Sequence, residues 1–202
     1  MWGAGVSAHQ VEGGNHNQWT AWELEHAKAR AAQAPYHYGD LAAWKDIARL
    51  ASNPANYVSA VASGHYARYR DDLKLLKKLN LDTFRFSIEW SRVEPEEGQW
   101  SDEALDHYRQ YFEYLKQLGV TPVVTLFHFT LPEWFAAKGG FAKRGNLVHF
   151  ERFACKVLDE FAPYMKWIIT VNEPTVYATE GYLRGNWPPG VSSKWRTWRV
   201  LH

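Results

Sequence analysis

The sequence predicts an α/β protein built around a parallel sheet, and three features indicate this fold class. Short apolar segments alternate along the chain with longer segments in which apolar residues recur at helical spacing. The links from helix to strand are short, whereas the links from strand to helix are longer and carry polar and aromatic residues. Because the carboxyl ends of parallel strands share one edge, these polar residues should gather there, as in a barrel or an open doubly wound sheet.

The first strand is expected within residues 2–8, which are small and apolar, and polar residues such as Gln10 and Glu12 follow it in a loop. Residues 20–64 are the least regular part of the chain. We interpret them as an elaborated loop after the first strand, within a single domain that covers residues 1–202. The expected elements of this loop are helices over 20–34 and 40–50, bounded by turns at Ala34-Pro35 and Asn53-Pro54.

Three helix–strand units follow, and each changes from helical spacing to a short β-rich run. Ser101 is placed to cap the second of these helices and Gly119 to end it, and a fourth helix is expected from Trp195. No Gly-x-Gly-x-x-Gly motif follows the first strand, so a dinucleotide-binding arrangement lacks support. The expected order is helix 66–79, strand 83–88, helix 101–118, strand 122–126, helix 147–161 and strand 167–171.

The last of these strands ends abruptly on Asn172, Glu173 and Pro174. Its apolar and β-branched residues predict a buried strand. Pro174 prevents the strand from continuing and fixes the backbone beside Glu173. At the carboxyl edge of a parallel sheet, such an acid is a candidate for chemistry. Taken alone, Asn-Glu-Pro is more often a surface acid beside a turn proline.

Composition argues against several classes of protein. The 23 Lys and Arg residues nearly balance the 22 Asp and Glu residues, so we expect neither nucleic acid nor an anionic membrane surface as a partner. The single Cys155 permits no intrachain disulfide, and its neighbours place it in the core. We expect no metal site and no cofactor, and the lack of a leader or a long apolar run predicts a cytoplasmic protein. The 11 Trp, 11 Tyr and 10 Phe residues supply flat rings of the kind that sugars stack on.

Four segments of the chain resemble glycoside hydrolase family 1, the retaining β-glucosidase and β-galactosidase group. They occur in the order and at the spacing of that family, from residue 2 to about residue 190. The resemblance implies a (β/α)8 TIM-barrel type of fold and a glycosidase that acts on a β-linked glycoside or oligosaccharide. The matching segments are Trp2-Gly3 with Ser7-Ala8-His9-Gln10-Val11-Glu12-Gly13, Phe84-Arg85-Phe86-Ser87-Ile88-Glu89-Trp90-Ser91-Arg92, Thr125-Leu126-Phe127-His128-Phe129 with Leu131-Pro132, and Thr170-Val171-Asn172-Glu173-Pro174.

The resemblance also implies roles for single residues. Glycoside hydrolysis needs an acid that protonates the leaving oxygen and a second carboxylate on the opposite face of the sugar. Glu173 matches the catalytic acid/base of the family, and Asn172 matches the ligand of the sugar 2-hydroxyl. Gln10 and His128 match the residues that bind the outer hydroxyls of the sugar. Arg85 matches the strand-two arginine that supports the nucleophile.

Plainer interpretations stand beside these roles. For Arg85, a structural role as a buried arginine paired with a strand carboxylate is an equal alternative. A lone histidine such as His128 is more often a core residue, but its position after the third strand, in phase with Glu173 after the fourth, favours a ligand contact. Glu12 and Glu89 are interpreted as carboxylates that anchor loops.

The chain carries only about the first four βα units of an eight-unit barrel, which usually takes about 250 residues. The nucleophilic glutamate of the family belongs near the end of a seventh strand, and residues 175–202 hold no matching motif. A half-barrel leaves an unpaired strand at each edge, so we expect a homo-oligomer or pairing with a complementary half. Three hypotheses follow: a β-glycosidase, a non-catalytic sugar-binding half-barrel, or a truncated fragment that needs a complementary half or self-association.

Overall fold

A computed structural model describes residues 1–202 and contains one sheet of four parallel strands. The strands are β1 (Gly3–Gly5), β2 (Thr83–Ser87), β3 (Thr121–Phe127) and β4 (Trp167–Val171). They pair in chain order, β1-β2-β3-β4, and every neighbouring pair is parallel. The predicted α/β fold with about four βα units is therefore confirmed. The sheet is an open arc with β1 at one edge and β4 at the other.

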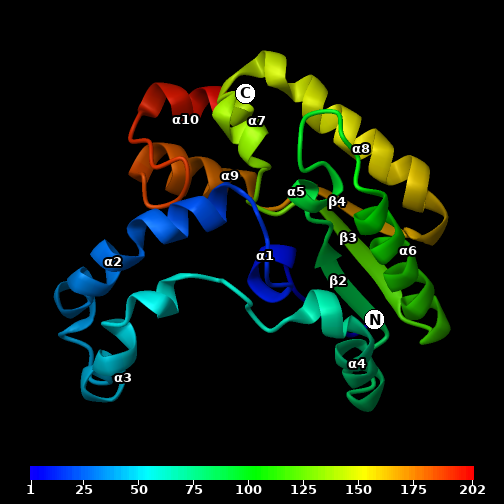
Figure 1. Cartoon of the computed structure of the whole chain (residues 1–202), viewed down its shortest axis with the longest axis horizontal. Coiled ribbons are helices and arrows are strands. Elements are labelled where there is room, and N and C mark those ends of the chain that lie inside the picture. The colour runs from blue at the N-terminus through cyan, green and yellow to red at the C-terminus, as the bar shows by residue number, and fades with distance from the viewer.

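Helices connect the strands, and α4, α6 and α8 lie along one side of the sheet (Figure 1). The elements between β1 and β2 are α1 (Ala8–Val11), α2 (Gln18–Tyr38), α3 (Trp44–Ala51), a 3-10 helix (Pro54–Tyr57) and α4 (His65–Lys78). Those between β2 and β3 are α5 (Trp90–Val93) and α6 (Asp102–Gln117). The later elements are α7 (Glu133–Ala137), 3-10 helices at Gly140–Ala142, Arg144–Asn146 and Ala162–Tyr164, α8 (Leu147–Phe161), α9 (Pro174–Ala178), a π-helix (Thr179–Arg184) and α10 (Lys194–Leu201). None of the helices combines the length and the apolar character needed to cross a membrane.

Local sequence signals explain most helix ends. The Ser101 side chain accepts a hydrogen bond from the backbone N–H of Ala104 at 3.2 Å, which satisfies a donor in the first turn of α6. Gly119 follows α6 with a φ of +65°, a conformation in which a side chain would be strained. Asn17 caps α2 in the same way, by accepting from the N–H of Thr20 at 3.0 Å.

Three predictions about local structure are wrong. Pro35 lies inside α2 and does not form a turn, because the helix continues past it to Tyr38 and packs a buried face of alanines that includes Ala31 and Ala34. The loop after β1 contains a short helix, α1, that hydrophobic periodicity does not reveal. A short helix, α7, also follows β3 in a segment predicted as a loop.

Two predictions about burial are also wrong. Trp167 and Ile168 of β4 are 50% and 41% exposed, because β4 is an edge strand with no neighbour on its outer side. Cys155 is exposed. It lies two residues from both Phe153 and Val157, which are fully buried, so it points to the opposite face of α8.

The hydrophobic core fills the space between the sheet and helices α4, α6 and α8. Alternate residues of a strand point to opposite faces, so Phe84 and Phe86 of β2 enter this core while Arg85 between them points to the other face. Trp90 is 2% exposed, and its ring is stacked on that of Phe153 with 4.9 Å between ring centroids. The helices thus cover one face of the sheet and leave the other to polar side chains.

Two leucines of α4 test this placement of the core. Leu73 is 1% exposed and Leu75 is 49% exposed on the same helix. We expect Leu73→Ala to lower the free energy of unfolding by about 2 to 5 kcal/mol, because it leaves a cavity under the sheet. Leu75→Ala should lower it by less than about 1 kcal/mol. Urea denaturation followed by circular dichroism measures both values, and similar losses for the two variants would contradict the placement.

Candidate functional site

The five candidate site residues come from four consecutive strand–loop junctions. Gln10 lies in α1 after β1, Arg85 lies within β2, His128 follows β3, and Asn172 and Glu173 follow β4. Because the strands are parallel and paired in this order, their carboxyl ends lie along one edge of the sheet. Apart from Arg85, which lies within its strand, the candidates are all on loops or helices at this edge.

Hydrogen bonds from Arg85 connect three strands. Its Nε donates to Thr125 Oγ1 of β3 at 3.1 Å, and its Nη2 donates to Asn172 Oδ1 at the end of β4. The backbone N–H of Asn172 donates to the carbonyl oxygen of Phe127 at 2.9 Å. The guanidinium is thus held by a hydroxyl and an amide, and it forms no ion pair. The alternative prediction, a pair with a strand carboxylate, is therefore wrong.

His128 carries a buried nitrogen that no protein group satisfies. Its Nδ1 has no hydrogen-bond partner, which is rare for a buried polar atom. Burial lowers the pKa of His128 to about 4, and the nearby positive charge of Arg85 adds to the effect. The imidazole is therefore neutral near pH 7. A neutral imidazole offers one donor and one acceptor to a ligand.

Glu173 lies at the N-cap position of α9 and is exposed. Its φ is +43°, a backbone conformation that is uncommon for residues other than glycine and that recurs at functional sites. Pro174 follows as the first residue of α9, and the N–H of Tyr177 donates to the carbonyl oxygen of Glu173 at 3.0 Å. The strand therefore stops at Glu173, with the carboxylate left in solvent.

Gln10 is exposed on α1, and its side-chain oxygen accepts a hydrogen bond from the Ser7 hydroxyl at 2.8 Å. Helix α1 is itself attached to the sheet, because the N–H of Ala8 donates to Ser87 Oγ of β2 at 2.8 Å. The amide group of Gln10 keeps its nitrogen available for another partner.

Two buried carboxylates hold the loops around these residues. Glu89 Oε2 accepts from Thr130 at 2.9 Å, and its Oε1 accepts from Ser91 at 2.8 Å and from Asn17 at 3.3 Å. It therefore connects the loops after β1, β2 and β3, in agreement with the interpretation of Glu89 as a loop anchor. Neither of its oxygens is left without a donor.

Glu12 has the same anchoring role. It accepts from Arg92 Nε and from the Tyr108 hydroxyl, each at 2.8 Å. Burial raises the pKa of Glu12 to about 7, although the charge of Arg92 opposes the rise. The positively charged Arg92 also donates to the carbonyl oxygen of Gly13.

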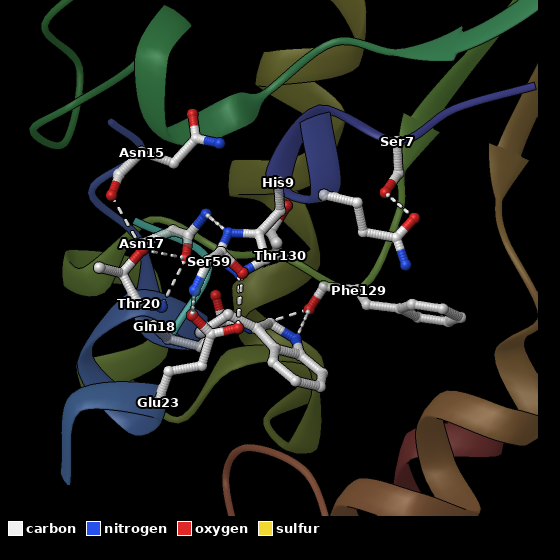
Figure 2. Close-up of polar contacts among 12 residues, drawn as sticks. Ser7, His9, Asn15, Asn17, Gln18, Thr20, Glu23, Ser59, Phe129 and Thr130 are labelled. Carbon is white, nitrogen blue, oxygen red and sulfur yellow. Dashed lines mark hydrogen bonds and ion pairs between the residues drawn. The ribbon is translucent and has the colours of Figure 1, made fainter. Parts of the chain in front are cut away.

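A further polar cluster joins α2 to α1 and is absent from the sequence predictions. Figure 2 shows His9 in contact with Glu23, Ser59 and Asn17. The His9 Nε2 lies 3.1 Å from Glu23 Oε1, and the Glu23 carboxylate also accepts from the backbone N–H and the hydroxyl of Ser59, both at 2.8 Å. His9 belongs to one of the four matching segments, but Asn17, Glu23 and Ser59 lie outside them, so only the structure reveals the cluster.

Aromatic rings line the loop beside His128. Phe129 adopts a φ of +72°, and its carbonyl oxygen accepts from Gln18 Nε2 at 2.8 Å and from Trp19 Nε1 at 3.0 Å (Figure 2). The ring of Trp187 packs against both Phe129 and Trp19, with centroids 5.1 and 5.4 Å apart. These tryptophans place part of the unusual aromatic content next to the candidate site. No group of three or more His, Cys, Asp or Glu side chains is arranged to hold a metal ion.

Comparison with known proteins matches the whole chain. The family model described as Glycosyl hydrolase family 1 matches residues 1–202. Human cytosolic β-glucosidase is 32% identical over 192 residues, and β-glucosidase A of Thermotoga maritima is 30% identical over 205 residues. These alignments cover 94% and 100% of this chain, but 37% and 42% of the two relatives. The chain spans about two fifths of the length of the curated relatives it matches.

Solved structures agree with the sequence matches. A β-glycosidase from Pyrococcus horikoshii superposes with a TM-score of 0.79 at 34% identity, covering 99% of this chain and 41% of that one. The family 1 β-glucosidase from Thermotoga maritima superposes with a TM-score of 0.83 at 28% identity, covering 100% of this chain and 42% of that one. Both the sequence and the four-stranded half-barrel are thus shared along the full length, and the chain belongs to glycosyl hydrolase family 1.

Proposed function

We propose that the chain supplies the acid/base side of a retaining β-glycosidase site, with Glu173 as the acid/base. One observation carries this proposal: an exposed carboxylate at the end of β4 stands beside an asparagine that Arg85 orients by a hydrogen bond across the sheet. The acid/base must reach the glycosidic oxygen while a neighbouring group holds the 2-hydroxyl. Glu173 and Asn172 are consecutive residues, so one substrate pose can meet both.

The nucleophile is proposed to come from a complementary polypeptide segment. A retaining mechanism places its two carboxyl groups about 5 to 5.5 Å apart. Glu12 and Glu89 are buried in hydrogen-bond networks, and Glu180, which is the only acid after Glu173, is paired with Arg184. These three carboxylates already have hydrogen-bond or ion-pair partners, so none of them is free to serve as the second catalytic carboxylate.

The sugar would be bound by Gln10, His128 and Asn172. The side-chain nitrogen of Gln10 and the unpaired Nδ1 of His128 both have hydrogen-bonding capacity for sugar hydroxyls. The substrate class that fits is a β-linked glycoside or oligosaccharide, as the names of the β-glucosidase relatives suggest. If the complementary carboxylate is never supplied, the same residues make a sugar-binding protein without turnover, which is the second candidate function.

The open edges of the sheet support association. Backbone groups of β1 and β4 face outward without a neighbouring strand, and Trp2, Trp167 and Ile168 are exposed there at 81%, 50% and 41%. Unpaired strand edges with apolar side chains are templates for pairing with another chain. We propose that a complementary half-barrel or a second copy pairs with these edges.

Activity tests the role of Glu173. The chain is assayed on p-nitrophenyl β-glucoside, alone and mixed with the remaining portion of β-glucosidase A from Thermotoga maritima. We expect hydrolysis in the mixture, and a loss of about 10²- to 10⁴-fold with Glu173→Gln, since general acid catalysis contributes that much. The loss should be much smaller with 2,4-dinitrophenyl β-glucoside, whose leaving group needs no proton.

The matched control for this assay is Glu180→Gln, which removes a nearby carboxylate and should leave the rate unchanged. Equal losses in kcat/KM with the two leaving groups, where kcat/KM reports the step that releases the leaving group, would contradict an acid/base role. Sugar binding without turnover in every mixture would favour the second candidate function.

Titration tests the state of His128. We expect imidazole signals in NMR spectra to report a pKa of about 4 for His128, and Arg85→Gln to move it toward the ordinary value by removing a positive neighbour. Lys116→Gln, which removes an exposed cation from α6, should not. Because the folded pKa lies below the unfolded one, the stabilising contribution of neutral His128 is present above pH 6.5 and is lost as the pH falls toward 4. A His128 that titrates at 6.5 in the folded chain would contradict a buried neutral imidazole.

Light scattering after size-exclusion chromatography tests the role of the edges. We expect the chain to associate with itself or with the complementary portion, and Ile168→Lys to abolish this, because a charge at an edge strand opposes pairing. Leu75→Lys is the control, since Leu75 is a comparably exposed apolar residue on α4. A chain that stays monomeric and does not bind the complementary portion would refute the association proposal.

A further inference from the structure

A cleft of about 620 Å³ lies apart from the candidate site residues. It opens between the 3-10 helix Gly140–Ala142 on one side and the π-helix and α10 on the other, and α10 lies against α9 (Figure 1). Its volume is within the range of about 300 to 1,000 Å³ that is typical of small-molecule sites. None of Gln10, Arg85, His128, Asn172 and Glu173 lines it.

The charges that line this cleft all have one sign. Lys143, Arg196 and Arg199 are lining residues, and no aspartate or glutamate lines the cleft. None of the three cations takes part in an ion pair, unlike Lys138 and Arg184, which do. The chain has a formal net charge of only +1, so this is a local segregation of charge. The two segments that form the walls, 134–150 and 181–202, contain no acidic residue.

Aromatic and apolar groups complete the lining. Trp195 is 62% exposed, although its ring is stacked on that of Trp198 with 5.2 Å between centroids and the Arg199 guanidinium lies 6.0 Å from its centroid. The ring surface that these two neighbours leave exposed can contact a ligand. Tyr177 and Tyr182 lie deeper, with ring centroids 5.8 Å apart. Burial raises the pKa of Tyr182, and the hydrogen bond with Tyr177 and the positive charge of Arg196 oppose the rise. An exposed indole beside several cations suits a ligand that has both a flat ring face and a negative group.

We propose that this cleft binds a small carbohydrate that carries a carboxylate or a phosphate group. Lys143, Arg196 and Arg199 would hold the anionic group, and Trp195 would stack on the sugar ring. Guanidinium groups suit this task, because their planar fork matches carboxylate and phosphate oxygens. The concave shape favours a small ligand over an extended polyanion. Glu173 does not line the cleft, so the proposal does not rest on the proposed glycosidase activity.

Isothermal titration calorimetry on the 202-residue chain tests the proposal with four probes: glucose 6-phosphate, glucuronate, inorganic phosphate and glucose. We expect at least one of the two anionic sugars to bind at least about tenfold more tightly than glucose, since a charge-assisted contact contributes that much. The same sugar should bind more tightly than inorganic phosphate, because only the sugar stacks on Trp195. The stronger of the two anionic sugars identifies the anionic group.

Variants separate a built site from diffuse attraction. Arg196→Gln and Arg199→Gln should each weaken binding of the anionic sugar at least about fivefold. Trp195→Ala should weaken binding of the sugar but not binding of inorganic phosphate. Lys194→Gln is the matched control, because Lys194 is an unpaired cation on the same helix that does not line the cleft. Circular dichroism confirms that each variant is folded. Glu173→Gln should bind as the parent chain does.

Three outcomes would overturn the proposal. Equal losses with Lys194→Gln and Arg196→Gln would mean nonspecific electrostatic attraction. Glucose binding as tightly as both anionic sugars would mean that the cations have no role. Inorganic phosphate binding as tightly as glucose 6-phosphate, with no binding of glucuronate, would mean an anion site without sugar recognition.

Discussion

Each strand of the sheet sends alternate side chains to opposite faces, and this constraint separates the core from the candidate site. Phe84 and Phe86 pack under the helices, whereas Arg85 between them reaches the opposite face and contacts Thr125 and Asn172. The Arg85 contacts span β2, β3 and the end of β4, so the position of Asn172 depends on the register of three strands. A shift of β2 by one residue would send the guanidinium into the core, and a shift of β3 or β4 would move Thr125 or Asn172 away from it.

Buried carboxylates hold the loops together through hydrogen bonds, as the backbone hydrogen bonds of the sheet hold the strands together. Glu89 accepts hydrogen bonds from three side chains on three different loops, and Glu12 joins the loop after β1 to Arg92 and Tyr108. Removing one partner of such a network leaves a buried charge or donor without compensation. Glu12 and Glu89 belong to the same sequence segments as candidate site residues. Their hydrogen bonds show that they hold the surrounding loops in place.

Much of the fold follows from local patterns, and the exceptions have physical causes. Helical spacing and the signals at Ser101 and Gly119 predict α6, because capping depends on neighbours in sequence. The sequence does not predict the exposure of β4, because an apolar run has the same pattern in a central strand and in an edge strand. Periodicity likewise does not reveal short helices such as α1 and α9. The positions of the candidate residues follow from strand order, but the His9 cluster and the one-signed cleft depend on contacts between distant segments, which balanced overall charge conceals.

The short first strand has a consequence for the candidate site. Gly3 pairs with Thr83, whereas Thr83 pairs with Thr121, so joining β1 to the sheet closes a loop about twice as long as joining β2 to β3. Each doubling of loop length adds only about 0.6 kcal/mol of closure entropy, but β1 contributes just three residues to offset it. Of the three strand pairings, that of β1 therefore closes the longest loop and forms the fewest paired residues. Gln10 follows β1 directly, so its place in the candidate site depends on the least extensive pairing in the sheet.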